Sequence, residues 1–327
     1  MILVTGGSGY IGSQFVRTYC KQKPQEKVLV VDNLVEGHPE ALEGLSNVVL
    51  ERLDIDDYDG LKRLFSMHEI RAVVHFAAFC YVGESQEDPG KYYQNNVAGS
   101  ISLFRAMEDC GVRKLVFSSS CATYGTPINV PIDESHPQNP INVYGLTKHL
   151  VEQIIKGYAD TRGWSYAALR YFNASGADRS GVFGESHDPE THIIPLALQV
   201  AAGKLDQLQI FGDDYDTPDG TCIRDYIHVE DLADAHIRAL NKLEIQEGGI
   251  AINLGTTFGA SVKEVVDICQ EVSGRKVKHV FCPRRPGDPA RLVADATKAY
   301  EYLGWKPKHD LRSIIQTAWT WETNKRY

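Results

Sequence analysis

The sequence predicts an α/β protein with a doubly wound parallel sheet and a second, smaller α+β domain. Three observations carry this prediction: short β-branched apolar runs alternate with helical patterns, a glycine-rich turn follows the first run, and the alternation fades after Asn173. Unbroken apolar runs such as residues 28–31 are typical of strands in a parallel sheet covered by helices on both faces. Strands and helices in alternation indicate a doubly wound sheet.

Each element can be justified in chain order. Runs rich in β-branched residues predict strands at residues 2–5, 27–32, 48–53, 72–76, 114–118, 166–170 and 250–254. Amphipathic patterns predict helices at residues 11–20, 93–110, 144–160 and 229–243. Ser261 and Glu264 have the spacing of a capping box, in which each side chain satisfies an amide of the first helical turn. We therefore expect a further helix directly after Ser261.

The fading of the alternation indicates the domain organisation. Turn clusters at residues 174–176 and 213–220 interrupt the pattern, which resumes with the helix at 229–243. We therefore expect a first domain of residues 1–174 plus 225–256, and a smaller domain of residues 175–224 plus 257–327.

The composition is that of a globular protein, with 43% apolar and 24% charged residues. The net charge of −9 disfavours nucleic acid and anionic membranes as partners, because both require a basic surface. We see no signal-peptide pattern and no apolar stretch of about 18 residues, so we expect a cytoplasmic protein. The seven cysteines form no Cys-x-x-Cys pair, and we expect free thiols and no metal site.

The glycine-rich turn at residues 5–12 reads TGGSGYIG and lies between the first strand and the first helix. It satisfies G-x-G-x-x-G, the pattern of a Rossmann-like dinucleotide site. We expect Gly6, Gly9 and Gly12 to let the backbone approach a pyrophosphate, which the amides of the helix N-terminus then bind.

An acidic residue at the end of the second strand indicates which dinucleotide binds. Asp32 lies twenty residues after Gly12, where a carboxylate accepts hydrogen bonds from the adenosine ribose. Residues 33–38 include no Arg or Lys to meet a 2′-phosphate, which favours NAD over NADP. Asp54 and Ile55, after the third strand, fit a contact with adenine.

Tyr144 and Lys148 are four residues apart and therefore share one face of a predicted helix. The ammonium of Lys148 and a positively charged nicotinamide would lower the pKa of the phenol, so that Tyr144 can act as a base. Residues 118–120 are serines at the carboxyl end of a strand, where open α/β sheets bind ligands. The pattern leaves open which serine points inward.

Taken together, the motifs of this chain resemble those of the extended short-chain dehydrogenase/reductase superfamily and, within it, of the UDP-glucose 4-epimerases. The resemblance covers essentially the whole chain. It is carried by TGGSGYIGS (5–13), VVDN (30–33), HFAA (75–78), VGES (82–85), YYQNN (92–96), FSSS (117–120), YGLTK (144–148), RYFN (170–173), GTCIRDYIHVEDLADAH (220–236) and PRRPGD (283–288).

The resemblance implies a role for each matching residue. It implies Tyr144 as the base, Lys148 as its partner and nicotinamide-ribose ligand, and Ser120 as hydroxyl partner. The implied NAD contacts are Tyr10, Ile11, Asp32, Asn33, Asp54, Ile55, Phe76, Ala77, Ala78, Asn95, Lys148 and Phe172. The implied substrate contacts, besides Ser120 and Tyr144, surround the UDP group and are Asn173, His192, Phe211, Arg224, Arg285 and Asp288. A homodimer is also implied.

The implied reaction inverts C4 of a UDP-hexose, UDP-glucose or UDP-galactose, through a 4-keto sugar, with a hydride passed to tightly bound NAD and back. Dehydratases of this fold have an Asp-Glu pair after the active-site hydroxyl, whereas this chain has Cys121 and Ala122. A nucleotide-sugar dehydrogenase or reductase is the second reading. A non-catalytic NAD-binding scaffold would normally have lost Tyr144 or Lys148.

Three departures from the family pattern leave the sugar open. Cys80 stands where many of these epimerases have a lysine near the cofactor, and Ala122 replaces a threonine near the sugar. Leu292 is intermediate in size at a position associated with admitting N-acetyl sugars. With Tyr81 next to Cys80, the chain is similar at these positions to the UDP-arabinose/UDP-xylose 4-epimerases. UDP-xylose/UDP-arabinose and UDP-N-acetylhexosamines therefore remain alternative substrates.

Overall fold

The structure is a computed structural model that describes residues 1–285 and 287–327. Pro286, within the segment 283–288 quoted above, lies outside the described residues. The chain divides into two compact units. Unit 1 comprises residues 1–125, 137–170 and 233–252, and unit 2 comprises residues 126–136, 171–232 and 253–327. The binding roles expected of the two sequence-derived domains stay a prediction.

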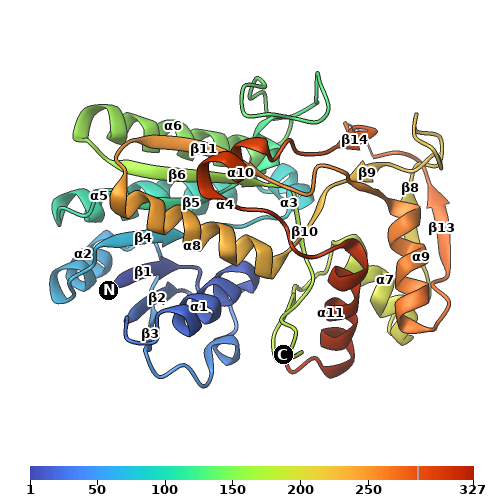
Figure 1. The fold of residues 1–327 in the computed structure, drawn as a ribbon, viewed down its shortest axis with the longest axis horizontal. Helices are drawn as coiled ribbons and strands as arrows, with labels where there is room; N and C mark the ends of the chain where they lie inside the picture. Colours follow the sequence, from blue (N-terminus) through green and yellow to red (C-terminus); the bar gives the residue numbers. More distant parts are fainter. Residues whose placement is uncertain (286) are drawn as a thin grey trace. The chain divides into compact units, whose positions relative to one another are not determined.

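Unit 1 is built on a seven-stranded sheet with the strand order β11-β6-β5-β4-β1-β2-β3 (Figure 1). Its strands are β1 (Ile2–Thr5), β2 (Val28–Asp32), β3 (Val48–Arg52), β4 (Ala72–His75), β5 (Lys114–Ser120), β6 (Ser165–Tyr171) and β11 (Gly249–Leu254). The pairs β1–β2, β2–β3, β1–β4 and β4–β5 are parallel. The order reverses between β1 and β4, and this reversal confirms the doubly wound sheet.

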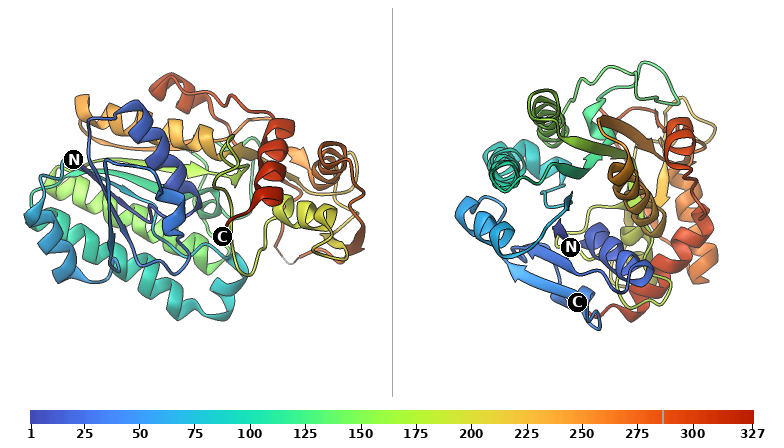
Figure 2. Two further views of the ribbon diagram at one scale, coloured as in Figure 1. Left: turned by 90° about the horizontal axis from the view of Figure 1, so that it is seen from below. Right: turned by 60° about the vertical axis from the view of Figure 1, so that its left-hand side comes forward.

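Helices cover both faces of the sheet (Figure 2). One face carries α2 (Tyr58–Met67), α5 (Ser100–Asp109) and α6 (Val143–Arg162), and the other carries α1 (Tyr10–Gln22) and α8 (Val229–Ile245). Buried residues of β1, β4 and β5 pack against apolar residues of α2, α5 and α6 in one cluster. Ile2, Val4 and Val74, on the opposite face of β1 and β4, are also fully buried, so these strands are apolar on both sides, as their uninterrupted apolar runs predicted.

Short helical elements complete unit 1. They are α3 (Val82–Glu87), α4 (Pro89–Tyr92), a π-helical turn at Tyr93–Gly99 and 3₁₀ turns at Pro39–Leu42 and Cys121–Thr123. All seven expected strands are present, with ends that differ by at most two residues. The helix expected at 93–110 is different in its first half, because residues 93–99 form the π-helical turn before α5 begins. Such turns are frequent at functional sites.

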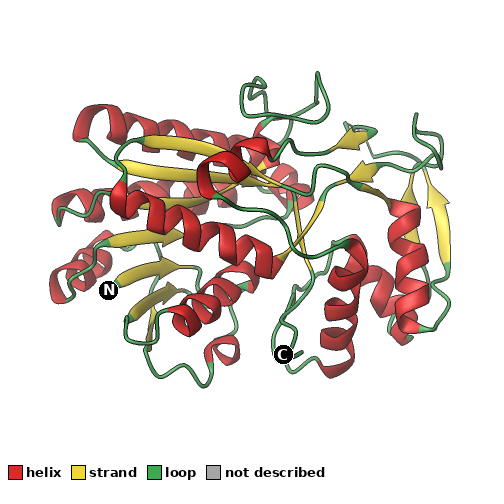
Figure 3. Ribbon diagram, viewed as in Figure 1, coloured by secondary structure: helices red, strands yellow, loops and turns green. Residues whose placement is uncertain are grey.

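Unit 2 combines three main helices with small sheets (Figure 3). Helices α7 (Ile193–Ala202), α9 (Val262–Ser273) and α11 (Leu311–Asn324) share one buried apolar cluster. The remaining elements are β7 (Asn173–Ser175), β8 (Leu208–Phe211), β9 (Ile223–Arg224), β10 (Tyr226–His228), β12 (Ala260–Ser261), β13 (His279–Cys282), β14 (Arg291–Leu292) and α10 (Thr297–Leu303). This α+β composition agrees with the sequence-based expectation.

Two local outcomes in unit 2 follow directly from side-chain chemistry. The capping box at the start of α9 is confirmed, since Ser261 accepts from the Glu264 amide and Glu264 accepts from the Ser261 amide. Helix α7 was not predicted, because Gln199 is the one polar residue of its sequence IIPLALQVAA, which therefore has no amphipathic period.

Within the described residues, no helix is long and apolar enough to span a membrane.

Candidate functional site

The glycine-rich turn lies between β1 and α1, at the point where the strand order reverses. Gly6 has a φ of 67°, and a Cβ there would lie 2.6 Å from the amide nitrogen of Ala77 after β4. A Cβ on Gly12 would lie 2.1 Å from the carbonyl oxygen of Gly6. The turn is thus closed to side chains at both positions. Beyond it, the N-terminus of α1 provides backbone amides and a positive dipole end, which favour an anion.

Asp32 is buried at the carboxyl end of β2 and is held by backbone amides. Its Oδ2 accepts from the amide of Ser8 at 2.9 Å, and its Oδ1 accepts from the amide of Leu34 at 2.9 Å. Burial raises the pKa of this carboxyl, and the two amides counteract the rise. A Cβ on Gly37 would lie 2.7 Å from Asp32 Oδ1, so a glycine keeps the space beside the carboxylate open.

The other expected contacts of the adenosine group lie on neighbouring strand ends of the same edge. Asn33 donates from Nδ2 to Oδ2 of Asp54 at 2.8 Å, which joins the ends of β2 and β3. Ile55 is buried directly after Asp54. The structure therefore brings Asn33 and Asp54 together, next in sequence to Asp32 and Ile55.

The segment after β4 and the π-helical turn present the next predicted residues. Phe76 contacts the ring of Phe15 on α1, with 5.6 Å between ring centroids, and Ala77 lies against Gly6. Asn95 is in the π-helical turn and donates from Nδ2 to Asn96 Oδ1 at 2.9 Å. Asn96 in turn donates to the hydroxyl of Thr147, the neighbour of Lys148, at 3.1 Å.

Tyr144 and Lys148 lie one helical turn apart near the start of α6, and both are buried. The Nζ of Lys148 is 5.9 Å from the centroid of the Tyr144 ring and donates to the carbonyl oxygen of Ser118 at 2.8 Å. Burial lowers the pKa of Lys148 to about 8. The cation is thus directed toward both the tyrosine ring and the end of β5.

The three serines at the end of β5 have different partners. The carbonyl of Ser118 accepts from Lys148, and the hydroxyl of Ser119 donates to Glu152 at 2.5 Å. The hydroxyl oxygen of Ser120 accepts from the amide of Ala122 at 3.1 Å and so caps the 3₁₀ turn that follows. The hydroxyl of Ser119 is thus directed to Glu152, and Ser120 as the hydroxyl partner of the reacting oxygen stays a prediction.

Several residues that support this arrangement were missed by sequence reasoning. Glu152 lies one turn after Lys148 on α6 and forms a buried ion pair with Arg170 of β6, with 2.5 Å between Oε2 and Nη2. Arg170 also donates to the hydroxyl of Tyr124 at 3.0 Å. Ser85 of α3 accepts from the amide of Tyr144 at 3.1 Å. A second four-residue step, from Lys148 to Glu152, was the available sequence signal.

In unit 2, four of the predicted UDP contacts form two pairs. Arg224 of β9 forms an ion pair with Asp288 and also donates to the carbonyl oxygen of Pro289 at 2.9 Å. The guanidinium of Arg285 stacks over the ring of Phe211, 4.1 Å from its centroid. Unit 2 therefore presents one arginine whose charge is paired and one that lies on an aromatic face.

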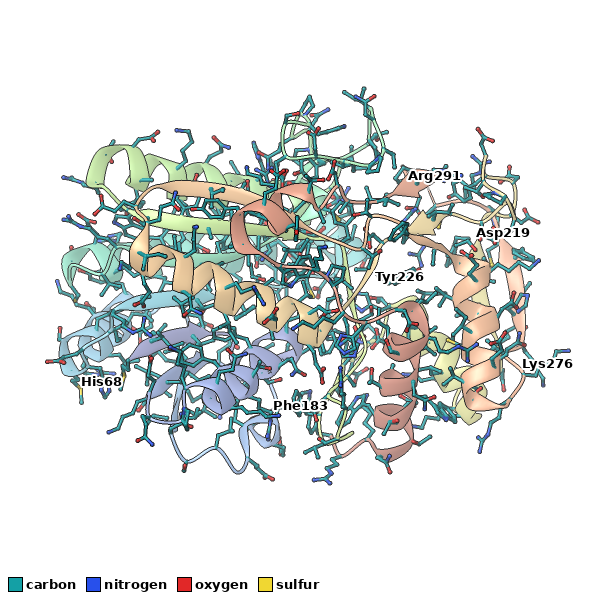
Figure 4. All side chains as sticks on the ribbon, viewed as in Figure 1. His68, Phe183, Asp219, Tyr226, Lys276 and Arg291 are labelled. Carbon is teal, nitrogen blue, oxygen red and sulfur yellow. The ribbon has the colours of Figure 1, made fainter. Side chains whose placement is uncertain are left out.

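Asn173 and His192 are brought together in a small pocket of unit 2. The pocket is also lined by Tyr226 of β10, labelled in Figure 4, and by Glu185. Asn173 donates from Nδ2 to the carbonyl oxygen of Asp225 at 3.0 Å, and Phe172 beside it is buried. The remaining positions singled out in the sequence are Cys80, which is exposed, Leu292 and Ala122, which are half-buried, and Tyr81, which donates to Glu36 at 2.9 Å.

The carboxylates beside His192 determine its charge. Burial disfavours the imidazolium, but Glu185 and then Glu190 outweigh this effect and raise the pKa of His192 well above its ordinary value. Despite burial, hydrogen bonds from His187 and His192 hold the pKa of Glu190 below its usual range, and the charge of His192 together with hydrogen bonds from both histidines does the same for Glu185.

The chain is similar to known proteins over nearly its whole length. Residues 2–255 match the family described as the NAD dependent epimerase/dehydratase family. The UDP-glucose 4-epimerase of Rhizobium meliloti (strain 1021) is 48% identical over 326 residues, 99% of this chain and 97% of that protein. The UDP-glucose 4-epimerase of Brucella ovis in complex with NAD is 48% identical, with a TM-score of 0.93 and coverage of 97% of each chain. That of Stenotrophomonas maltophila, with bound NAD and formylated UDP-arabinopyranose, is 42% identical, with a TM-score of 0.95 and coverage of 99% and 98%.

Proposed function

The chain belongs to the NAD dependent epimerase/dehydratase family, and from this premise we propose that it is an NAD-dependent epimerase that inverts C4 of a UDP-hexose. UDP-glucose and UDP-galactose are the proposed pair, by similarity to the relatives named above. The observation that carries the proposal is the buried Tyr144–Lys148 pair, with Lys148 bonded to the end of β5 two residues before Ser120.

The residues of unit 1 fit NAD. The turn at Gly6 and Gly12 has no room for a Cβ, as a pyrophosphate site requires, and Asp32 offers a carboxylate in the place of a ribose acceptor. The residues that would hold NAD are the cofactor contacts named in the sequence analysis, with Lys148 as the proposed ligand of the nicotinamide ribose. Bound NAD supplies a hydride acceptor that can return the hydride to either face of the oxidised sugar.

Proton transfer is the task of this chain's own side chains. The phenolate of Tyr144 takes the proton of the C4 hydroxyl, and the Ser120 hydroxyl holds the reacting oxygen by a hydrogen bond. The nearby ammonium of Lys148 favours the phenolate because opposite charges attract more strongly in a buried site. The hydrogen bond from Lys148 to Ser118 keeps that ammonium in place.

Inversion also requires that the sugar turn over while its UDP group stays bound. Arg224 and Arg285 provide charge for the diphosphate, and Asp288 and Asn173 provide hydrogen-bonding groups. Strong binding of the UDP and weak binding of the hexose avoid trapping one orientation of the sugar. His192 and Phe211 complete the proposed contacts with the UDP group.

The turn after Ser120 argues against elimination. Its first two residues are Cys121 and Ala122, and neither provides the carboxyl acid and base that a dehydratase requires there. The proposed assembly is a cytoplasmic homodimer, which rests on family resemblance and on the sequence pattern.

A direct assay tests the proposal. The purified protein, with its bound dinucleotide quantified, is incubated without added cofactor with UDP-galactose, UDP-xylose or UDP-N-acetylgalactosamine, and products are followed by NMR. We expect catalytic conversion of UDP-galactose to its C4 epimer, and the three rates rank the sugars. Unchanged sugars with NAD present would overturn the proposal. Stoichiometric NADH with an oxidised sugar would identify a dehydrogenase instead.

A further inference from the structure

A cluster of two histidines and two glutamates lies in unit 2, on the segment that precedes α7. The sequence Glu185-Ser-His187-Asp-Pro-Glu190-Thr-His192 has two pairs of such residues at a spacing of two. Along extended backbone, residues two apart point to the same side. A bend at Asp188 and Pro189 joins the two pairs, so all four side chains can meet at one place.

One potential ligand atom from each of these four residues lies within 4.8 Å of every other. The Nδ1 of His192 is 2.7 Å from Glu185 Oε1 and 3.1 Å from Glu190 Oε1. The Nδ1 of His187 is 3.3 Å from Glu185 Oε1 and 3.7 Å from Glu190 Oε2. Both imidazoles thus direct the same ring nitrogen to the same two carboxylates.

We propose that Glu185, His187, Glu190 and His192 form a binding site for one divalent transition-metal ion, with Zn²⁺ as the reference ion. Two imidazole nitrogens and two carboxylate oxygens are a donor set that suits such ions. Ligands about 2.1 Å from a tetrahedral ion are separated from one another by about 3.4 Å. The four separations between an imidazole Nδ1 and a carboxylate oxygen, from 2.7 to 3.7 Å, bracket this value, with Glu190 facing His187 through Oε2 and His192 through Oε1.

The electrostatics of the cluster also favour a cation. The side chains of Glu185 and Glu190 are each 6% exposed, and their ion-pair partners are the two histidines. In the metal-free protein the imidazolium of His192 compensates part of the charge of the two buried carboxylates, and a bound ion would displace its proton. A divalent ion compensates both charges at once, and the 42% exposed side chain of His192 leaves a way in from solvent.

The surroundings hold the ligands in place, as outer contacts do in metal sites. Glu190 Oε1 accepts from the amides of Thr191 and His192, both at 2.8 Å. The indole of Trp321 on α11 donates to the carbonyl oxygen of Glu185 at 2.7 Å. Phe183, labelled in Figure 4, is buried two residues before Glu185. Because His192 is the N-cap of α7 and lines the pocket with Asn173, a bound ion would also fix one wall of that pocket.

A second group in unit 2, formed by His228, Glu230 and His309, provides a matched control. There Arg179 pairs with Glu230, and His309 pairs with Asp231 at 3.0 Å. Burial lowers the pKa of His228 to about 4, whereas hydrogen bonds to Asp231 and Glu230 raise that of His309 to about 9. This group already has an arginine cation beside its carboxylate, so we do not assign an ion to it.

The test measures metal binding and does not use epimerase activity as a readout. The holoenzyme is treated with a chelator, its dinucleotide content is checked, and it is titrated with Zn²⁺ by calorimetry, with metal content measured after gel filtration. Co²⁺ is used in parallel, because a four-coordinate site gives an intense visible absorption band. The variants are Glu190→Gln, His187→Gln and, as the control, Glu230→Gln.

The proposal expects one Zn²⁺ per wild-type chain, a Co²⁺ band, and binding weakened roughly 100-fold in Glu190→Gln and His187→Gln. Glu230→Gln is expected to bind like the wild type. Circular dichroism in chelator shows whether each variant is folded, and the Co²⁺ band tests the wild type independently of any variant. A wild-type protein without stoichiometric Zn²⁺, or equal binding in folded Glu190→Gln, would overturn the metal site and leave the proposed epimerase activity untouched.

Discussion

Lys148 donates a hydrogen bond of 2.8 Å to the carbonyl oxygen of Ser118, and this bond connects helix α6 to the end of β5. It directs the ammonium to the edge of the sheet where Ser120 follows, one helical turn from Tyr144. The same burial that lowers the pKa of Lys148 to about 8 strengthens its effect on the phenol. The proposed base and its activating cation are therefore positioned by one contact between a helix and a strand.

Replacing Tyr144 by Phe is expected to lower kcat for UDP-galactose by about 10²- to 10⁴-fold, because the substitution removes the proposed proton acceptor. The ring itself is retained, so packing and dinucleotide content are expected to stay unchanged. NMR product analysis measures the loss of activity, and quantification of released NAD shows whether the dinucleotide content is unchanged. A variant with full NAD content and more than a tenth of wild-type activity would exclude Tyr144 as the base.

Substitution of Gly12 by Ala is expected to reduce bound NAD strongly, because the new Cβ would lie 2.1 Å from the Gly6 carbonyl oxygen. The turn must then move, and the proposed pyrophosphate site moves with it. Gly157→Ala on α6 is the matched control, since a Cβ there meets nothing within 4 Å. That control is expected to retain NAD and to gain about 0.5–1 kcal/mol of stability. Equal NAD content in both variants would contradict the assignment of the turn.

The buried pair of Glu152 and Arg170 gives a prediction about stability. Glu152→Gln leaves the arginine without its carboxylate and is expected to lower the free energy of unfolding by about 3–5 kcal/mol. The exposed pair of Lys156 and Asp160 on the same helix is the control, and Lys156→Met is expected to change stability by less than about 1 kcal/mol. Denaturant unfolding of the three proteins measures both effects. Similar losses of unfolding free energy in the two variants would show that the buried Glu152–Arg170 pair stabilises the protein no more than the exposed pair does.

His75 gives a prediction about pH. It is buried between the hydroxyls of Thr5 and Ser100, and burial lowers its pKa from 6.5 to about 3. Between these values the unfolded chain binds a proton that the folded chain does not, so stability falls as the pH decreases through this window. The expected contribution is about 1.4 kcal/mol per pH unit. Unfolding measured from pH 7 to pH 4 should show a shallower slope for His75→Asn, and equal slopes would exclude His75 as a source of acid sensitivity.

Much of unit 1 was predictable because its signals are local. The runs that became β1 and β2 are apolar without interruption, and the turn between β1 and α1 repeats glycine where a Cβ does not fit. The step from Tyr144 to Lys148 places both on one helix face for the same reason, since helical periodicity depends on neighbours in sequence. Asp32 could be predicted as the ribose acceptor because it lies at the end of the second strand, twenty residues after Gly12.

The predictions that failed concern elements whose shape depends on their surroundings. The π-helical turn at Tyr93–Gly99 has the composition of an ordinary helix, and α7 has no polar face to reveal a period. The Glu185–His192 cluster was missed, although its residues are close in sequence. These residues come together only through the bend at Asp188 and Pro189, and no cysteine spacing marks them as a possible metal site.

The sequence by itself determined the doubly wound sheet, the dinucleotide turn, and the placement of Tyr144 and Lys148 on one helix, because each depends on spacing along a few neighbouring residues. Only the tertiary structure decided which serine at the end of β5 faces Glu152, and that Glu152 pairs with Arg170. Only the tertiary structure decided that Arg285 lies over Phe211. These partners are far apart in the chain, and long-range packing, which no local period records, brings their side chains within reach.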